Sequence, residues 1–109
     1  MKLRVKIWVT ANNQPIIGEG GARLMQLVKK YGSISRAAEE MAMSYRTAWG
    51  RLKEIEKRLG KPVVISKAGG GEGGRSRLTS NGIWLLEQYL ELDKRINKSA
   101  QNIFEELFK

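Results

Sequence analysis

The chain has 109 residues, which is enough for a single domain with a modest hydrophobic core. It contains neither cysteine nor histidine, so a disulfide framework, a thiolate metal site and imidazole-based catalysis are excluded, and we expect no cofactor and no enzyme activity. The net charge is +9, and residues 23–79 hold thirteen Lys and Arg against five Glu. Positive charge concentrated in this way predicts a polyanionic partner, and we expect nucleic acid.

The first residues of the chain, Leu3 to Thr10, alternate between apolar and polar or charged side chains. This period of two predicts a half-buried strand. Asn12–Asn13 is typical of a turn, and Pro15 to Ile17 is predicted as a short return strand. Trp8 points to the other face of the predicted strand, where it either covers another element or a second chain, or is incidentally exposed.

No segment is typical of a membrane or secreted protein. No apolar run approaches the roughly 18 residues that a membrane span needs. The N-terminus alternates charged with apolar residues, unlike the continuous apolar core of a signal peptide. We therefore expect a cytoplasmic protein without a membrane partner.

After the predicted return strand, the chain is predicted to form three helices, over residues 20–31, 36–41 and 45–59. Ser35 and Ser44 stand where the second and third helices need N-caps. Ala42 and Met43 alone separate the second helix from the cap of the third. Two helices joined by so short a turn predict a helix-turn-helix over residues 35–59.

The stretch GGGEGGRS, from Gly69 to Ser76, satisfies a GxGxxG pattern and differs from a phosphate loop by Arg75 in place of lysine. A phosphate loop must open a helix, whereas strand-like residues follow here, and Glu72 would repel a phosphate. We interpret the glycines instead as the tip of a wing over residues 63–79, flanked by Lys67, Arg75 and Arg77. A hairpin tip without a ligand role is the alternative.

The third helix of this segment has one apolar and one cationic face. At 100° per residue, Tyr45, Ala48, Leu52, Ile55 and Leu59 share a face that we expect in the core. Arg46, Gly50, Lys53 and Lys57 lie opposite. Arg46 and Thr47, near the helix start, suit contacts with base edges. Lys53, Lys57 and Arg36 suit contacts with phosphates. Gly50 either allows a close approach to DNA or is merely tolerated. The predicted DNA-contacting residues are Arg36, Ser44, Arg46, Thr47, Gly50, Arg51, Lys53, Lys67, Arg75 and Arg77.

Five short motifs occur in order along this part of the chain: Ser33-Ile34-Ser35, Ala37-Ala38, SYRTAW from Ser44 to Trp49, the glycines from Gly69 to Gly74, and Leu78-Thr79 followed by Gly82. With them, residues 20–92 resemble the winged-helix N-terminal domain of ModE-type molybdenum-transport regulators and, more distantly, the DNA-binding head of the LysR family. The resemblance implies a dimeric DNA-binding fold. Full-length regulators of the ModE type continue into domains that sense molybdate; we expect none in this chain and identify no molybdate site.

The C-terminal residues 80–109 are predicted to form one helix of roughly 28 residues, because no Gly or Pro follows Gly82. A second apolar stripe runs along it at near-heptad spacing, which favours pairing with a second copy of the helix. A helix folded back over its own domain is the alternative. The predicted dimerisation residues are Leu85, Tyr89, Leu92, Ile96, Ile103 and Leu107.

These features together predict a mainly helical α+β protein. We expect a winged helix-turn-helix core with an N-terminal strand or hairpin over residues 1–79, and a helix for core packing and dimerisation over residues 80–109. The predicted function is sequence-specific binding of double-stranded DNA by a homodimeric transcriptional regulator. A sequence-tolerant architectural DNA-binding protein and a protein-interaction module on a winged-helix scaffold are the alternatives.

Overall fold

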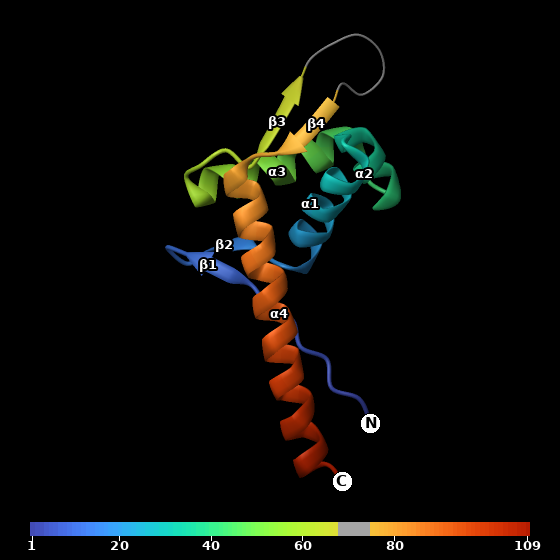
Figure 1. Cartoon of the computed structure of the whole chain (residues 1–109), viewed down its shortest axis with the longest axis vertical. Helices are drawn as coiled ribbons and strands as arrows, with labels where there is room; N and C mark the ends of the chain where they lie inside the picture. Colours follow the sequence, from blue (N-terminus) through green and yellow to red (C-terminus); the bar gives the residue numbers. More distant parts are fainter. Residues whose placement is uncertain (68–74) are drawn as a thin grey trace.

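A computed structural model describes residues 1–67 and 75–109. It confirms the mainly helical α+β class, with helices α2 and α3 and the hairpin β3–β4 at one end of the molecule and helix α4 running away from them (Figure 1). Because α4 extends far beyond the other elements, the molecule is elongated, measuring 58 × 29 × 20 Å. The elements in chain order are β1 Val9–Ala11, β2 Gln14–Ile17, α1 Glu19–Tyr31, α2 Ile34–Glu40, α3 Tyr45–Leu59, β3 Val64–Lys67, β4 Arg75–Leu78 and α4 Ser80–Leu107.

The N-terminal segment differs from the strand predicted over Leu3 to Thr10. Its side chains alternate between half-buried and exposed as expected, but regular strand structure begins only at Val9, and no described strand pairs with residues 1–8. The segment instead runs along α4 (Figure 1). The Tyr89 hydroxyl donates to the Ile7 carbonyl at 2.9 Å, and Gln101 Nε2 donates to the Leu3 carbonyl at 3.3 Å. The period of two therefore predicted correctly which side chains of this segment are half-buried, but it did not predict that the segment packs against α4.

The hairpin β1–β2 forms as its turn residues predicted. Asn12 and Asn13 have φ values of 53° and 64°, as a two-residue hairpin turn requires. Trp8 is 59% exposed, and its indole lies over Gly18, where an added Cβ would be 2.6 Å from Trp8 Cδ1. Arg58 ties the hairpin to α3 by donating from Nη1 to the Pro15 carbonyl at 2.7 Å.

The core lies where α1, α2, α3, the wing strands and the first three turns of α4 meet. α1, α2 and α3 each bury one apolar face against the others, and the start of α4 covers α1 from the other side. Burial of these side chains is the main stabilising term, at about 25 cal/mol per Å² of apolar area. The buried apolar residues are Ile17, Ala22, Leu24, Met25, Val28, Ile34, Ala37, Ala38, Ala48, Leu52, Ile55, Val63, Val64, Leu78, Leu85, Leu86 and Tyr89.

Helix capping follows the sequence with one correction. Ser44 caps α3 and Thr79 caps α4 as their positions indicate. The cap of α2, however, is Ser33 and not Ser35: the Ser33 hydroxyl accepts from the Arg36 N–H at 3.1 Å. The helix begins two residues earlier than predicted because Ile34 is buried in the core and belongs to its first turn.

Glu56 joins the end of α3 to the start of the wing. Its Oε2 accepts from the Val63 and Val64 N–H groups at 2.9 and 3.2 Å, and its Oε1 lies 2.9 Å from Lys53 Nζ. Burial alone would raise the pKa of Glu56, but the hydrogen bonds from Lys53, Val63 and Val64 outweigh it and leave that pKa lowered. The carboxylate therefore stabilises the folded state as an anion.

We expect Glu56→Gln to reduce the free energy of unfolding by about 1–2 kcal/mol at neutral pH, because charge-assisted hydrogen bonds to two backbone amides are weakened. A lowered folded-state pKa means that this stabilisation is present above the unfolded-state value, near 4.5, and is lost as the pH falls through the folded-state value. Urea unfolding of both proteins between pH 7 and pH 3 checks this. A difference between them that persists unchanged at pH 3 contradicts the role of the anion.

Candidate nucleic-acid interface

The outward face of α3 carries the side chains that the helical wheel placed there. Arg46, Gly50, Lys53 and Lys57 are exposed, while Ala48, Leu52 and Ile55 on the opposite side are buried. Tyr45 is a correction: we expected it in the core, but it is 49% exposed. It lies at the edge of the buried stripe in the first turn, beyond the reach of the core, and its ring stacks on Trp49 with centroids 6.5 Å apart.

Lys53 is held at the rim of this face. Its ammonium lies 2.9 Å from Glu56 Oε1 and 4.3 Å from the centroid of the Trp49 ring. The predicted contact of Lys53 with a phosphate thus requires it to exchange the carboxylate for the phosphate. An exposed ion pair contributes only about 0–1 kcal/mol, so this exchange costs little.

The start of α3 is organised by its cap. The Ser44 hydroxyl accepts from the Thr47 N–H at 3.1 Å and donates to Thr47 Oγ1 at 3.0 Å. The hydroxyl proton of Ser44 is therefore already used, and the side chain orients Thr47. The Thr47 hydroxyl keeps its own proton for an outside acceptor. Arg46, next to it, forms no ion pair within residues 1–67 and 75–109.

Arg51 lies apart from the other predicted DNA-contacting residues. Its guanidinium is on the flank of α3 that faces the start of α1, where Nη1 is 4.0 Å from a Cβ built at Gly20. It also lines a hollow with Trp8 and Pro15 of the N-terminal segment. Arg51 is exposed, and its position on this flank agrees with the helical wheel; its contact with DNA stays a prediction.

The wing carries a cationic face of its own. β3 and β4 pair antiparallel with Ile65 opposite Arg77 and Lys67 opposite Arg75, so these four side chains project from the same side of the hairpin. All four are exposed. The glycine-rich tip that we predicted at Gly69 to Gly74 lies outside the described residues.

A hollow of about 550 Å³ separates this wing face from the end of α1. The Ser76 N–H donates to the Gly32 carbonyl at 2.9 Å, which fixes β4 against the end of that helix. Beside this hollow, two cationic side chains lie over the Tyr31 ring, with Arg36 Cζ 4.7 Å and Lys30 Nζ 5.2 Å from the ring centroid. The sequence did not single out Lys30 or Tyr31, because only the fold brings the end of the first helix beside the wing.

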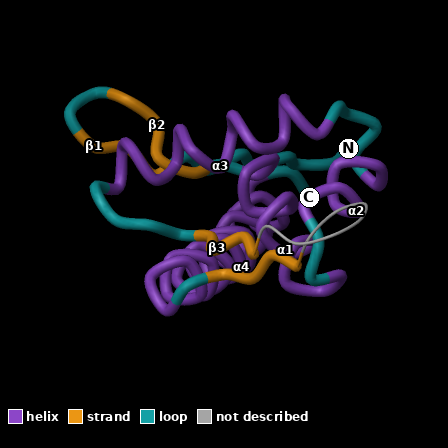
Figure 2. The backbone as a smooth tube through the Cα atoms, turned by 90° about the horizontal axis from the view of Figure 1, so that it is seen from above, coloured by secondary structure: helices purple, strands orange, loops and turns teal. Residues whose placement is uncertain are grey.

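These cationic groups share one end of the molecule. Figure 2 looks down on that end and shows α3 and the hairpin β3–β4 lying across it. α4 extends in the opposite direction (Figure 1). A helix and a hairpin that are both cationic and lie at the same end of the molecule can together bind an extended polyanion.

α4 provides a second surface, and here two predicted residues are corrected. Leu85 and Tyr89 belong to the protomer's own core, at 5% and 4% exposure, because the rest of the domain covers the first three turns of the helix. Leu92, Ile96, Ile103 and Leu107 continue the same stripe beyond the domain and are exposed. Despite its length, α4 is not apolar enough to cross a membrane, and neither is any other helix in the part of the chain that the structure describes.

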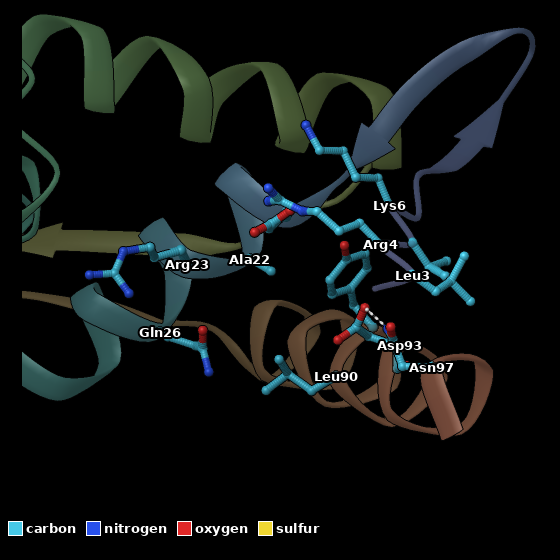
Figure 3. A pocket seen from close by; sticks show the side chains of 12 residues that line it. Leu3, Arg4, Lys6, Ala22, Arg23, Gln26, Leu90, Asp93 and Asn97 are labelled. Carbon is cyan, nitrogen blue, oxygen red and sulfur yellow. Dashed lines mark hydrogen bonds between the residues drawn. The ribbon is translucent and has the colours of Figure 1, made fainter. Parts of the chain in front are cut away.

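A hollow of about 510 Å³ lies between the N-terminal segment, α1 and α4 (Figure 3). Its lining mixes cations such as Arg4 and Arg23 with Asp93, whose Oδ1 accepts from Asn97 Nδ2 at 3.0 Å. Burial raises the pKa of Tyr89 in the same wall, with Asp93 and Glu19 adding to the effect. The phenol therefore stays protonated and keeps its hydrogen bond to the Ile7 carbonyl.

Comparison with known proteins identifies the fold. Residues 22–83 match the family described as bacterial regulatory helix-turn-helix protein, lysR family. The chain belongs to this family. The matched residues run from α1 through the helix-turn-helix and the wing to the first turn of α4, and so include both cationic elements.

Curated relatives match most of the length of this chain, and a solved structure shares its fold. The molybdenum transport protein ModE of Azotobacter vinelandii is 31% identical over 85 residues, which are 78% of this chain and 32% of the relative. The transcriptional regulator ModE of Haemophilus influenzae is 32% identical over 84 residues, again 32% of its length. The chain thus spans about a third of these relatives. The DNA-binding domain of CbnR, solved in complex with DNA, superimposes on this chain with a TM-score of 0.60 at 20% identity. The match covers 76% of this chain and 93% of the CbnR chain.

Proposed function

We propose that the chain binds double-stranded DNA sequence-specifically, as the DNA-binding part of a homodimeric, cytoplasmic transcriptional regulator. α3 enters the major groove, and the wing contacts the backbone or the minor groove. The observation that carries this proposal is that α3 and the wing, each with an exposed cationic face, lie together at the end of the molecule from which α4 runs away. Membership of a family of regulatory helix-turn-helix proteins supports it.

Arg46 and Thr47 are the proposed readers of base edges. Both are exposed in the first turn of α3, and the N-terminal residues of a recognition helix are those that contact base edges. A guanidinium can donate two hydrogen bonds to guanine, and the Thr47 hydroxyl has a proton to donate. Arg36, Lys57 and the wing cations are proposed to contact phosphates, which position the protein without reading sequence.

The exposed stripe on α4 is the proposed dimer interface. Leu92, Ile96 and Ile103 follow near-heptad spacing on a helix that leaves its own domain. Residues 91–109 hold four Lys and Arg against four acidic residues, so two copies of this part carry no net charge that would oppose pairing. A homodimer of this kind favours a two-fold symmetric site with half-sites about one helical turn apart.

The test of base reading compares Arg46→Ala with Lys57→Ala on a duplex selected by the protein and on a scrambled duplex. Loss of a bidentate base contact is expected to cost Arg46→Ala about 1–3 kcal/mol on the selected duplex only, so its preference between the two falls about tenfold or more. Lys57→Ala is expected to weaken both duplexes by the same factor, because a phosphate is present in every sequence. Fluorescence anisotropy at fixed salt measures both.

Equal losses for Arg46→Ala on the selected and scrambled duplexes would show that Arg46 contacts only the backbone. The assignment of base reading to the first turn of α3 would then be wrong. The proposal of DNA binding itself would stand, because it depends on the wild-type protein and not on this variant.

A further inference from the structure

We propose that Gly50 is the position at which α3 seats against the floor of the major groove, so that the absence of a side chain there sets the affinity for the cognate site. This inference rests on the proposed function and goes further by giving one residue the role of controlling how deeply the helix enters. It concerns the middle of the exposed face of α3, between the turn that carries Arg46 and the turn that carries Lys57.

Glycine is unfavourable at this place for the fold alone. It lies within the 15-residue helix α3, where glycine is among the least favourable residues because of its backbone freedom in the unfolded chain. Its φ is not positive, since among the described glycines only Gly32 and Gly60 have positive φ values. The backbone of Gly50 is therefore one that alanine adopts without strain.

Internal packing gives no reason for the glycine either. A Cβ built at Gly50 meets no atom within 4 Å. At Gly82 the same construction meets the Val63 backbone, and at Gly21 it lies 3.3 Å from Ile55 Cδ1. Those two glycines are explained by the close packing of elements within the protomer, whereas Gly50 opens only toward the outside.

The neighbouring long side chains leave this opening unfilled. Lys53, one turn along the helix, is drawn toward Trp49 and Glu56 by the contacts at 4.3 and 2.9 Å. These two residues lie on the other side of Lys53 from Gly50, at 100° per residue around the helix. Glu54, four residues after Gly50, is neutralised by Arg58, whose Nη2 lies 2.8 Å from Glu54 Oε1. The space at Gly50 is therefore open and not opposed by an unpaired acid, which allows a DNA base pair to approach more closely than a side chain would.

The experiment compares three variants on the duplex that the wild-type protein selects. Gly50→Ala adds one methyl group at the proposed contact. Gly20→Ala adds the same group to a helical glycine of α1 that also has open space, with the nearest atom 4.0 Å away, and serves as the matched control. Gly50→Lys adds a charge to the face, which strengthens binding if charge alone matters and weakens it if close approach matters.

Gly50→Ala is expected to raise the midpoint of thermal unfolding, and Gly20→Ala to leave it unchanged or raise it slightly, because alanine favours a helix. Gly50→Ala is expected to weaken binding to the selected duplex by about tenfold or more, Gly50→Lys to weaken it further, and Gly20→Ala to leave it unchanged. Wild-type affinity in Gly50→Ala, or tighter binding by Gly50→Lys, would overturn the inference. A wild-type protein that binds no DNA would instead overturn the proposed function.

Discussion

Gly82→Ala is expected to destabilise the fold by about 3 kcal/mol, although it replaces glycine by a better helix former. Gly82 lies in the first turn of α4, where the helix packs against Val63, the residue just before strand β3 of the wing. A Cβ added there would overlap the Val63 carbonyl oxygen and lie 3.1 Å from its carbon. The Val63 carbonyl cannot yield easily, because it accepts from the Thr79 N–H at 2.9 Å.

Urea unfolding of Gly82→Ala and of the control Gly20→Ala measures this effect. The control adds a methyl group in open space and is expected to leave stability unchanged or slightly raised. Since Thr79 Oγ1 also donates to the Pro62 carbonyl at 2.7 Å, the junction of wing and α4 is held at several points and has little room to relax. Stability within about 0.5 kcal/mol of the wild type would contradict the close contact that the structure places here.

Replacing Ile96 and Ile103 together by glutamate is expected to convert the proposed homodimer to monomers. Both side chains are exposed in the protomer, at 38% and 55%, so the fold itself should persist. Full burial of an isoleucine contributes about 1.5–3 kcal/mol, and the interface can add only the part that the protomer leaves exposed, roughly half of it for each of the four isoleucines in the two chains. We expect dissociation to become more favourable by roughly 3 kcal/mol or more, a change of over a hundredfold in the dissociation constant.

Sedimentation equilibrium of this double variant checks the expectation, with Asn102→Glu as control. Asn102 is exposed on α4 about 100° around the helix from Ile103, so its variant adds a carboxylate outside the stripe. The control should remain dimeric. A double variant that stays dimeric would contradict the α4 interface, and a wild-type protein that is monomeric would contradict the homodimer.

Local features of the fold were predictable from the sequence. The caps Ser44 and Thr79, the turn at Asn12–Asn13 and the 28-residue helix α4 follow from residue preferences and periodicity within a few positions of the chain. The cationic face of α3 follows in the same way from the period of 3.6. These elements were predicted correctly because the interactions that set them are local.

The errors come from packing between distant segments. A helical wheel shows which residues share a face but not where the domain ends, so it placed Tyr45 in the core, and Leu85 and Tyr89 on the dimer face. The anchoring of the wing by Glu56 depends on amides seven and eight residues away. Only the fold brings Arg51 to the N-terminal hairpin.

The most direct test of the central claim is selection of duplexes from a random-sequence pool by the purified protein at two salt concentrations, followed by sequencing of the retained DNA. We expect enrichment of a two-fold symmetric motif. We also expect the affinity to fall steeply with salt, since each neutralised phosphate steepens the slope of log K against log salt by about 0.9. Salt-sensitive binding without any enriched motif would contradict sequence-specific recognition and favour an architectural role. No binding at either salt concentration would contradict DNA binding altogether and favour a protein-interaction module.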